Sequence, residues 1–195
     1  DLLVHALSLS FYLKSAMETK RNLNQYFTPK HIAKKCIDIL HSHLPRFDNP
    51  EWKWLYVEPA AGDGAFVNEL PFKQTIALEA DKDLCEKNGY KHVPLPLGFL
   101  ATYPDKLGFP KSAYERTIVV GNPPFSQPRQ DGLGRPENMA LKFVNHASSI
   151  GAYCAMVLGA NFKRSNVLDK VNKKYKLLHQ EELGEIEWII GHTRK

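Results

Sequence analysis

The stretch Thr117-Ile118-Val119-Val120-Gly121-Asn122-Pro123-Pro124-Phe125 decides the fold. Its first four residues are β-branched, which is typical of a buried strand, and Gly121 joins them to the tetrapeptide 122–125. Because open α/β sheets bind ligands where their strands end, we expect the tetrapeptide to line a binding site. Two prolines stiffen its backbone, an amide precedes them and an aromatic ring follows. The stretch therefore predicts a rigid pocket for one flat, amine-bearing group.

Strands and helices are expected to alternate around this stretch. The apolar segments predict strands at 54–57, 75–78, 93–97, 117–120, 152–158 and 186–190. Helices are expected at 65–70, 139–149 and 166–174, and another after Thr28, whose hydroxyl would cap it ahead of Pro29. The apolar face of that helix is expected to consist of Ile32, Ala33, Cys36, Ile37 and Leu40. The alternation predicts an α/β fold with a doubly wound, mostly parallel, Rossmann-like sheet.

The bulk properties are those of one ordinary globular domain of 195 residues. The net charge of +5 leans modestly toward polyanionic partners. Three widely spaced cysteines without a Cys-x-x-Cys motif argue for a reducing compartment, and against disulfides or a zinc site. Residues 1–16 are an N-terminal extension of unknown role, too short to span a bilayer, and we expect a packed helix or a gene-model extension.

The first turn of the predicted sheet has the sequence Glu58-Pro59-Ala60-Ala61-Gly62-Asp63-Gly64-Ala65-Phe66. It lacks the spacing of a dinucleotide fingerprint and the Gly-Lys-Ser/Thr of a P-loop, so no phosphate cradle is indicated. Gly62 and Gly64 let the backbone pass close under a ligand, and the following helix can receive a carboxylate. Glu79, at the tip of the second strand, suits the two hydroxyls of a ribose. Adenosine with a carboxylate and without phosphate describes S-adenosylmethionine.

Three motifs occur in the order of the gamma group of adenine-N6 DNA methyltransferases. They are Asn24-Gln25-Tyr26-Phe27-Thr28-Pro29, then 58–66 with Glu79, then 122–125, and with them the chain resembles that family from about residue 24 to 164. The Asn-Pro-Pro-Phe tetrapeptide is shared with RNA and protein methyltransferases, whereas the Gln-Tyr-Phe-Thr-Pro element is much more selective for adenine-N6 enzymes. The resemblance implies one methyltransferase domain over 17–195, without a separate target-recognition domain, in the cytoplasm or on the nucleoid.

The resemblance also implies which residues hold the cofactor. They are Tyr26, Phe27, Thr28, Glu58, Pro59, Gly62, Gly64 and Glu79. The first three would close over the methionyl end of S-adenosylmethionine, and Glu79 would bind its ribose.

The catalytic residues implied by the resemblance are Asn122, Pro123, Pro124 and Phe125. The Asn122 side-chain oxygen and the Pro123 carbonyl would accept both amine hydrogens of adenine, favouring a pyramidal nitrogen as the methyl arrives. Phe125 would stack on a base swung out of its DNA strand. The cofactor carries its own leaving group, so the chemistry needs no metal ion and no covalent residue.

The chain departs from the family pattern at two positions. Gly98 stands where an acid usually follows the third strand, and Asp105 is poorly spaced to replace that acid. Leu158-Gly159-Ala160-Asn161 stands where a proline is common. Specificity is then expected from the loop 126–138, from the basic helix after Asn161 or from a partner subunit. The polar residues of that loop are Gln127, Arg129, Gln130 and Arg135.

Three functions stay open on the sequence alone. Methylation of adenine N6 in DNA is favoured by the basic charge and by the Gln25-to-Pro29 element. A methyltransferase acting on RNA or on a protein glutamine amide would use the same pocket, because both present a planar amine. A non-catalytic subunit that binds nucleic acid or a partner agrees with Gly98 but not with the intact tetrapeptide 122–125.

Overall fold

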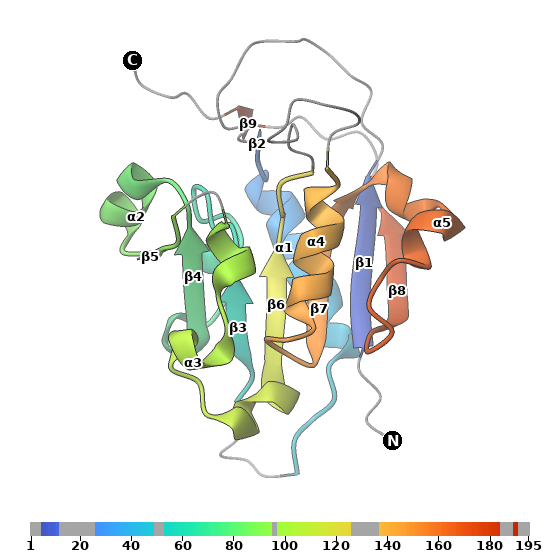
Figure 1. The fold of residues 1–195 in the computed structure, drawn as a ribbon, viewed down its shortest axis with the longest axis horizontal. Helices are drawn as coiled ribbons and strands as arrows, with labels where there is room; N and C mark the ends of the chain where they lie inside the picture. The colour runs from blue at the N-terminus through green and yellow to red at the C-terminus, as the bar shows by residue number, and fades with distance from the viewer. Residues whose placement is uncertain are drawn as a thin grey trace.

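A parallel sheet of seven strands forms the centre of the protein in the computed structural model, which describes residues 5–11, 26–48, 53–94, 97–125, 137–183 and 189–190 (Figure 1). Each pair of neighbouring strands is parallel. In spatial order the strands are β5 (Lys91–His92), β4 (Thr75–Glu79), β3 (Leu55–Glu58), β6 (Thr117–Gly121), β7 (Tyr153–Gly159), β1 (His5–Phe11) and β8 (Lys176–Glu182). The five strands from β5 to β7 have the Rossmann-like order 3-2-1-4-5, which confirms the predicted α/β class.

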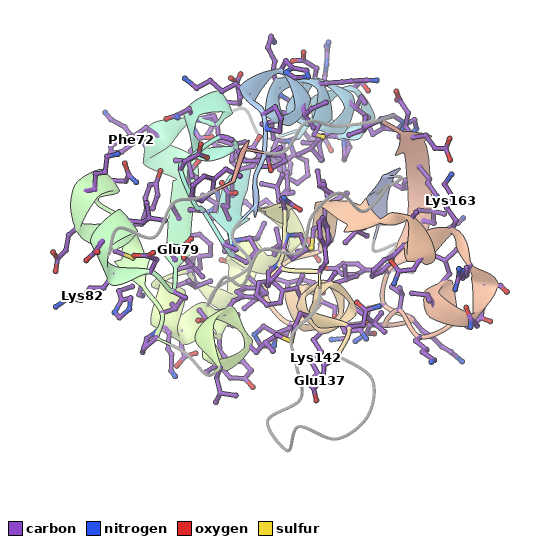
Figure 2. The ribbon with its side chains drawn as sticks, turned by 90° about the horizontal axis from the view of Figure 1, so that it is seen from above. Phe72, Glu79, Lys82, Glu137, Lys142 and Lys163 are labelled. Carbon is purple, nitrogen blue, oxygen red and sulfur yellow. The ribbon has the colours of Figure 1, made fainter. Side chains whose placement is uncertain are left out.

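Helices cover both faces of this sheet, and the alternation of strand residues explains why. In β6, Ile118 and Val120 pack with the apolar face of α1 (Lys30–His43), whereas Val119 packs on the other face with α4 (Met139–Ala147). The face predicted for the first helix is buried at every position named: Ile32, Ala33, Cys36, Ile37 and Leu40. Seen from above, α1 and α4 lie on opposite sides of the strands (Figure 2). Strands buried on both faces account for the continuous apolar runs in the sequence.

Shorter elements connect the strands. They are α2 (Lys82–Asn88), α3 (Pro104–Leu107), α5 (Ser165–Leu168) and the 3₁₀ helices η1 (Val67–Glu69), η2 (Phe72–Gln74), η3 (Gly98–Ala101), η4 (Lys111–Arg116) and η5 (Ala160–Lys163). Asp81 caps α2 by accepting hydrogen bonds from the Asp83 and Leu84 N–H groups. A separate two-stranded antiparallel sheet joins β2 (Tyr26–Phe27) to β9 (Ile189–Ile190) and lies beyond the end of the main sheet where the strands finish (Figure 1).

Several predicted elements are corrected by the structure. The first helix begins at Lys30 with no side-chain cap, so the expected role of the Thr28 hydroxyl is wrong. The third strand is Lys91–His92 and ends before the predicted range 93–97, of which 95–96 lie outside the described residues; Pro94, which has no N–H to donate, stands near its end. The basic helix expected at 166–174 is only the single turn of α5. Of the strand predicted at 186–190, only Ile189–Ile190 lies within the described residues.

The two ends of the chain also differ from expectation. Of residues 1–16, for which a packed helix or a gene-model extension is expected, the described part is 5–11; it forms no helix but the strand β1, which inserts between β7 and β8 of the main sheet. Strand β8 was not predicted, because its sequence is mostly charged or polar and it lies at the edge of the sheet. No helix in the described parts of the chain is long and apolar enough to cross a membrane.

Gly151, two residues before β7, lies very close to the backbone of Thr117. A Cβ at this position would lie 2.4 Å from the Thr117 carbonyl oxygen at the start of β6. We expect Gly151→Ala to lower the free energy of unfolding by about 3 kcal/mol, because neither backbone can yield without separating β6 from β7. Urea unfolding measures this cost. Gly89→Ala is the matched control: its Cβ meets open space, so only its positive φ costs about 1 kcal/mol, and equal losses in both variants would contradict the prediction.

Candidate ligand site at the strand ends

A cavity of about 160 Å³ opens where β3, β4 and β6 end. It is the place at which a Rossmann-like sheet binds ligands, because the connections leave these strands in opposite directions. The predicted site residues that line it are Phe27, Thr28, Glu58, Pro59, Gly62, Glu79, Asn122, Pro123, Pro124 and Phe125. The structure thus brings together three motifs that are far apart in the sequence.

The turn after β3 forms the floor of the cavity. The Ala61 N–H donates to the Leu78 carbonyl at 2.9 Å, which ties the turn to β4, and the Gly64 N–H donates to the Ala61 carbonyl at 2.8 Å. Gly62 has φ of 53°, and a Cβ there would lie 3.0 Å from the Phe27 ring. Glycine is required at this position, because any side chain would be strained and would displace the aromatic wall.

Gly64 does not line the cavity, contrary to the role implied for it. A Cβ at Gly64 would lie 2.3 Å from the Tyr90 hydroxyl, so the glycine makes room for the tyrosine. The Tyr90 pKa is raised by desolvation and by the nearby carboxylates of Glu58, Asp63 and Glu79. Gly64 therefore supports the site from outside by letting Tyr90 pack against the turn.

Glu79 holds two turns together at the edge of the cavity. Its Oε2 accepts the Gly62 N–H at 2.7 Å, and its Oε1 accepts the N–H groups of Ala80 at 2.7 Å and Asp81 at 2.9 Å. In the view from above, Glu79 lies nearer the centre of the molecule than Lys82, which lies at its periphery (Figure 2). The buried carboxylate is thus fixed by three backbone donors, and Oε2, which accepts only one of them, keeps acceptor capacity toward the cavity.

Glu58 is the most deeply buried acid of the cavity, with 2 % of its surface exposed. It ends β3, and a Cβ on Gly121 of the neighbouring β6 would lie 3.1 Å from its Oε1. Its Oε2 has no hydrogen-bond partner among the described residues. Burial, and then the charges of Glu79 and Asp63, raise the Glu58 pKa well above its ordinary value of 4.5. Burial therefore favours the neutral form of the Glu58 carboxyl group, and one of its oxygens is unused among the described residues.

Asn122 offers a second unused oxygen. It follows β6 directly, and its Oδ1 is buried without a hydrogen-bond partner among the described residues. A buried amide oxygen without a partner costs free energy, so its presence in a cavity points to a donor on a ligand. Pro123 is buried beside it, and Pro124 and Phe125 line the same cavity.

The opposite wall is apolar and was largely missed by sequence reasoning. Met139 and Phe143 come from the buried face of α4, Val93 follows β5 directly, and Phe99 lies in η3. The helical spacing of Met139 and Phe143 is visible in the sequence, but it marks core positions equally well. Gly98 lines this part of the cavity, as expected for the position that lacks the usual acid, whereas Asp105 is exposed and does not line it.

The charged side chains among the described lining residues are all acidic. The lining contains Glu58, Asp63, Glu79 and Asp81 and, among the described residues, no lysine, arginine or histidine. A ligand with phosphate groups would meet only carboxylates there, although the chain as a whole carries a net charge of +5. The described residues also hold no group of three or more His, Cys, Asp or Glu side chains suited to a metal ion. The cavity therefore suits a flat organic ligand that carries positive charge and no phosphate.

Two parts of the predicted site lie outside the described residues. They are the Tyr26 side chain, of which only the backbone in β2 is described, and the polar loop at 126–136 with Gln127, Arg129, Gln130 and Arg135.

Comparisons with known proteins give no independent assignment. No protein-family model matches the sequence, and neither a curated protein nor a solved structure matches the chain. The function is therefore argued from the site itself.

Proposed function

We propose that this protein transfers a methyl group from S-adenosylmethionine to the N6 amine of adenine in DNA. The observation that carries the proposal is the cavity at the strand ends, where the described lining contains four acids and no basic side chain beside the buried, unpaired oxygen of Asn122. The class of cofactor follows from the acids, and the class of substrate follows from the tetrapeptide 122–125.

The lining suits the cationic groups, the ribose and the purine ring of S-adenosylmethionine. The cofactor carries positive charge on its sulfonium and ammonium groups and has no phosphate, which agrees with a wall of carboxylates. Glu79 keeps acceptor capacity for ribose hydroxyls, and the apolar wall around Val93, Leu97 and Phe99 suits a purine ring. When bound, S-adenosylmethionine supplies the methyl group and departs as a neutral thioether.

The residues 122–125 suit an aromatic amine as methyl acceptor. The lone pair of such an amine is delocalised into its ring, so it becomes a good nucleophile only when the nitrogen turns pyramidal. The unpaired Asn122 oxygen and the Pro123 carbonyl accept the two amine hydrogens in that geometry, which stabilises the transition state more than the ground state. Phe125 offers a face for stacking a base that has left its strand.

DNA is the favoured nucleic acid. The net charge of +5 supports binding to a polyanion, and the Gln25-to-Pro29 element resembles the adenine-N6 enzymes that act on DNA. The same pocket would accept a base in RNA or a glutamine amide, and a non-catalytic subunit would keep the cavity without using it. These alternatives are outcomes of the experiment that follows.

Incubation with S-adenosylmethionine labelled in its methyl group tests the proposal against three acceptors in parallel: unmethylated DNA, RNA and a total protein extract. We expect N6-methyladenine in the nucleosides released from DNA, and no label in the other two samples. Label confined to RNA or protein would change the substrate class. Absence of label in every sample, with the cofactor bound, would support the non-catalytic subunit instead.

A further inference from the structure

Glu58 has a place in the cavity that its structural surroundings do not explain. It is buried at the end of β3, and within the described parts of the chain its Oε2 has no partner and no lysine, arginine or histidine lines the cavity around it. Buried carboxyl groups normally have partners, because an unpaired one costs free energy. The missing partner of Glu58 is therefore to be sought in the ligand.

The groups that face Glu58 come from every element packed around it. None of those that the structure describes brings a positive charge to it. Glu79 from β4 and Asp63 from the turn after β3 add negative charge, and Tyr90 after α2 is a neutral hydroxyl. The Val67 N–H of η1 is the one donor that favours the charged carboxylate, and Gly121 of β6 brings no charge. Lys30 and Lys87 act on Asp63, at the outer side of the turn.

We propose that Glu58 selects a positively charged ligand by releasing its own proton when that ligand binds, so that the resulting carboxylate pairs with the positive charge of the ligand. In the empty cavity the O–H bond keeps the carboxyl neutral. When a cationic ligand enters, that bond breaks, the proton passes to solvent buffer, and the carboxylate left behind neutralises the ligand. The inference rests on the proposed function, because S-adenosylmethionine is the cation named there.

The proposed proton release makes the affinity for the cationic ligand increase as the pH rises. The raised pKa means that Glu58 in the free protein holds its proton above pH 4.5, so the ligand must displace it. Raising the pH removes the competing proton, and the dissociation constant for S-adenosylmethionine is expected to fall about tenfold per pH unit until the free-protein pKa of Glu58 is passed. The affinity for a neutral ligand is not expected to increase with pH in this way.

Titration calorimetry at pH 7 in phosphate and in Tris measures the exchange, because the two buffers take up a proton with different heats. We expect S-adenosylmethionine to release protons on binding, and the release to be larger the further the pH lies below the free-protein pKa of Glu58. The neutral 5′-methylthioadenosine is expected to bind without release. In Glu58→Gln, S-adenosylmethionine is expected to bind more weakly and without release. The matched control Glu86→Gln removes an exposed acid of α2 that does not line the cavity, and it is expected to keep the release.

The outcomes separate this inference from the proposed function. S-adenosylmethionine that binds with equal heat in both buffers, or a release that survives in Glu58→Gln, overturns the proton exchange and leaves the methyltransferase proposal standing. Failure of S-adenosylmethionine to bind at all overturns both. If Glu58→Gln does not fold, the pH dependence of affinity in the unaltered protein decides, and an affinity that is flat with pH counts against the exchange.

Discussion

Asn122→Ala is expected to lower the rate of methyl transfer by a factor of about 10² to 10³ and to leave the affinity for S-adenosylmethionine nearly unchanged. The reason is that the Asn122 Oδ1, which is unpaired among the described residues, accepts a hydrogen bond from the substrate amine. That hydrogen bond is strongest in the transition state. Single-turnover transfer and cofactor titration measure the two quantities separately. The fold does not depend on this oxygen, so the urea midpoint is expected to stay within experimental error.

Asn166→Ala is the matched control for that experiment. Asn166 is an exposed amide on α5 and does not line the cavity, so its loss leaves both transfer and binding unchanged. A transfer rate for Asn122→Ala equal to that of the control would contradict the catalytic role of the amide. A parallel loss of cofactor affinity would move Asn122 from the acceptor subsite to the cofactor subsite.

Glu79→Gln is expected to lower both stability and cofactor affinity. The glutamine retains one oxygen, so its NH₂ group must face a backbone N–H that the carboxylate now accepts, either that of Gly62 or those of Ala80 and Asp81. The lost charged hydrogen bond costs about 1.5 to 3 kcal/mol in the free energy of unfolding. Because either orientation of the glutamine releases one of the two turns that line the cavity, affinity for S-adenosylmethionine is expected to fall by about tenfold or more.

Urea unfolding and cofactor titration measure these effects, with Glu86→Gln as the matched control. Glu86 is an exposed residue of α2 whose ion pair with Lys82 spans 3.5 Å between solvated side chains. Its replacement is expected to change stability by less than about 0.5 kcal/mol. If Glu79→Gln is as stable as the control, the three backbone hydrogen bonds do not hold the turn as described.

The central sheet was predictable because its strands are buried on both faces. Such strands are continuous β-branched or apolar runs, as at Thr117–Val120, and the sequence marks them without ambiguity. Strand β8 lies at an edge, where polar residues such as Gln180 and Glu182 are tolerated, and no apolar run marks it. The position of β1 between β7 and β8 depends on pairing over long sequence separation, which local patterns do not contain.

The site was predictable where chemistry limits the residue type. Glu58, Glu79 and Asn122 are polar groups directly after apolar strands, and the fold brings such positions together at one edge. The apolar wall was missed because Met139 and Phe143 follow the same helical spacing as any core residues. Gly64 was misassigned for a steric reason: the Tyr90 hydroxyl fills the space beside it, and sequence spacing does not show that contact.

Diffraction from crystals grown with S-adenosylhomocysteine, the methyl-depleted form of the cofactor, tests the central claim most directly. The account predicts density for the ligand in the cavity at the ends of β3, β4 and β6, with its ribose against Glu79 and its sulfur on the side of Asn122. Density for the ligand at another surface, or a cavity that stays empty at saturating ligand, would contradict the account.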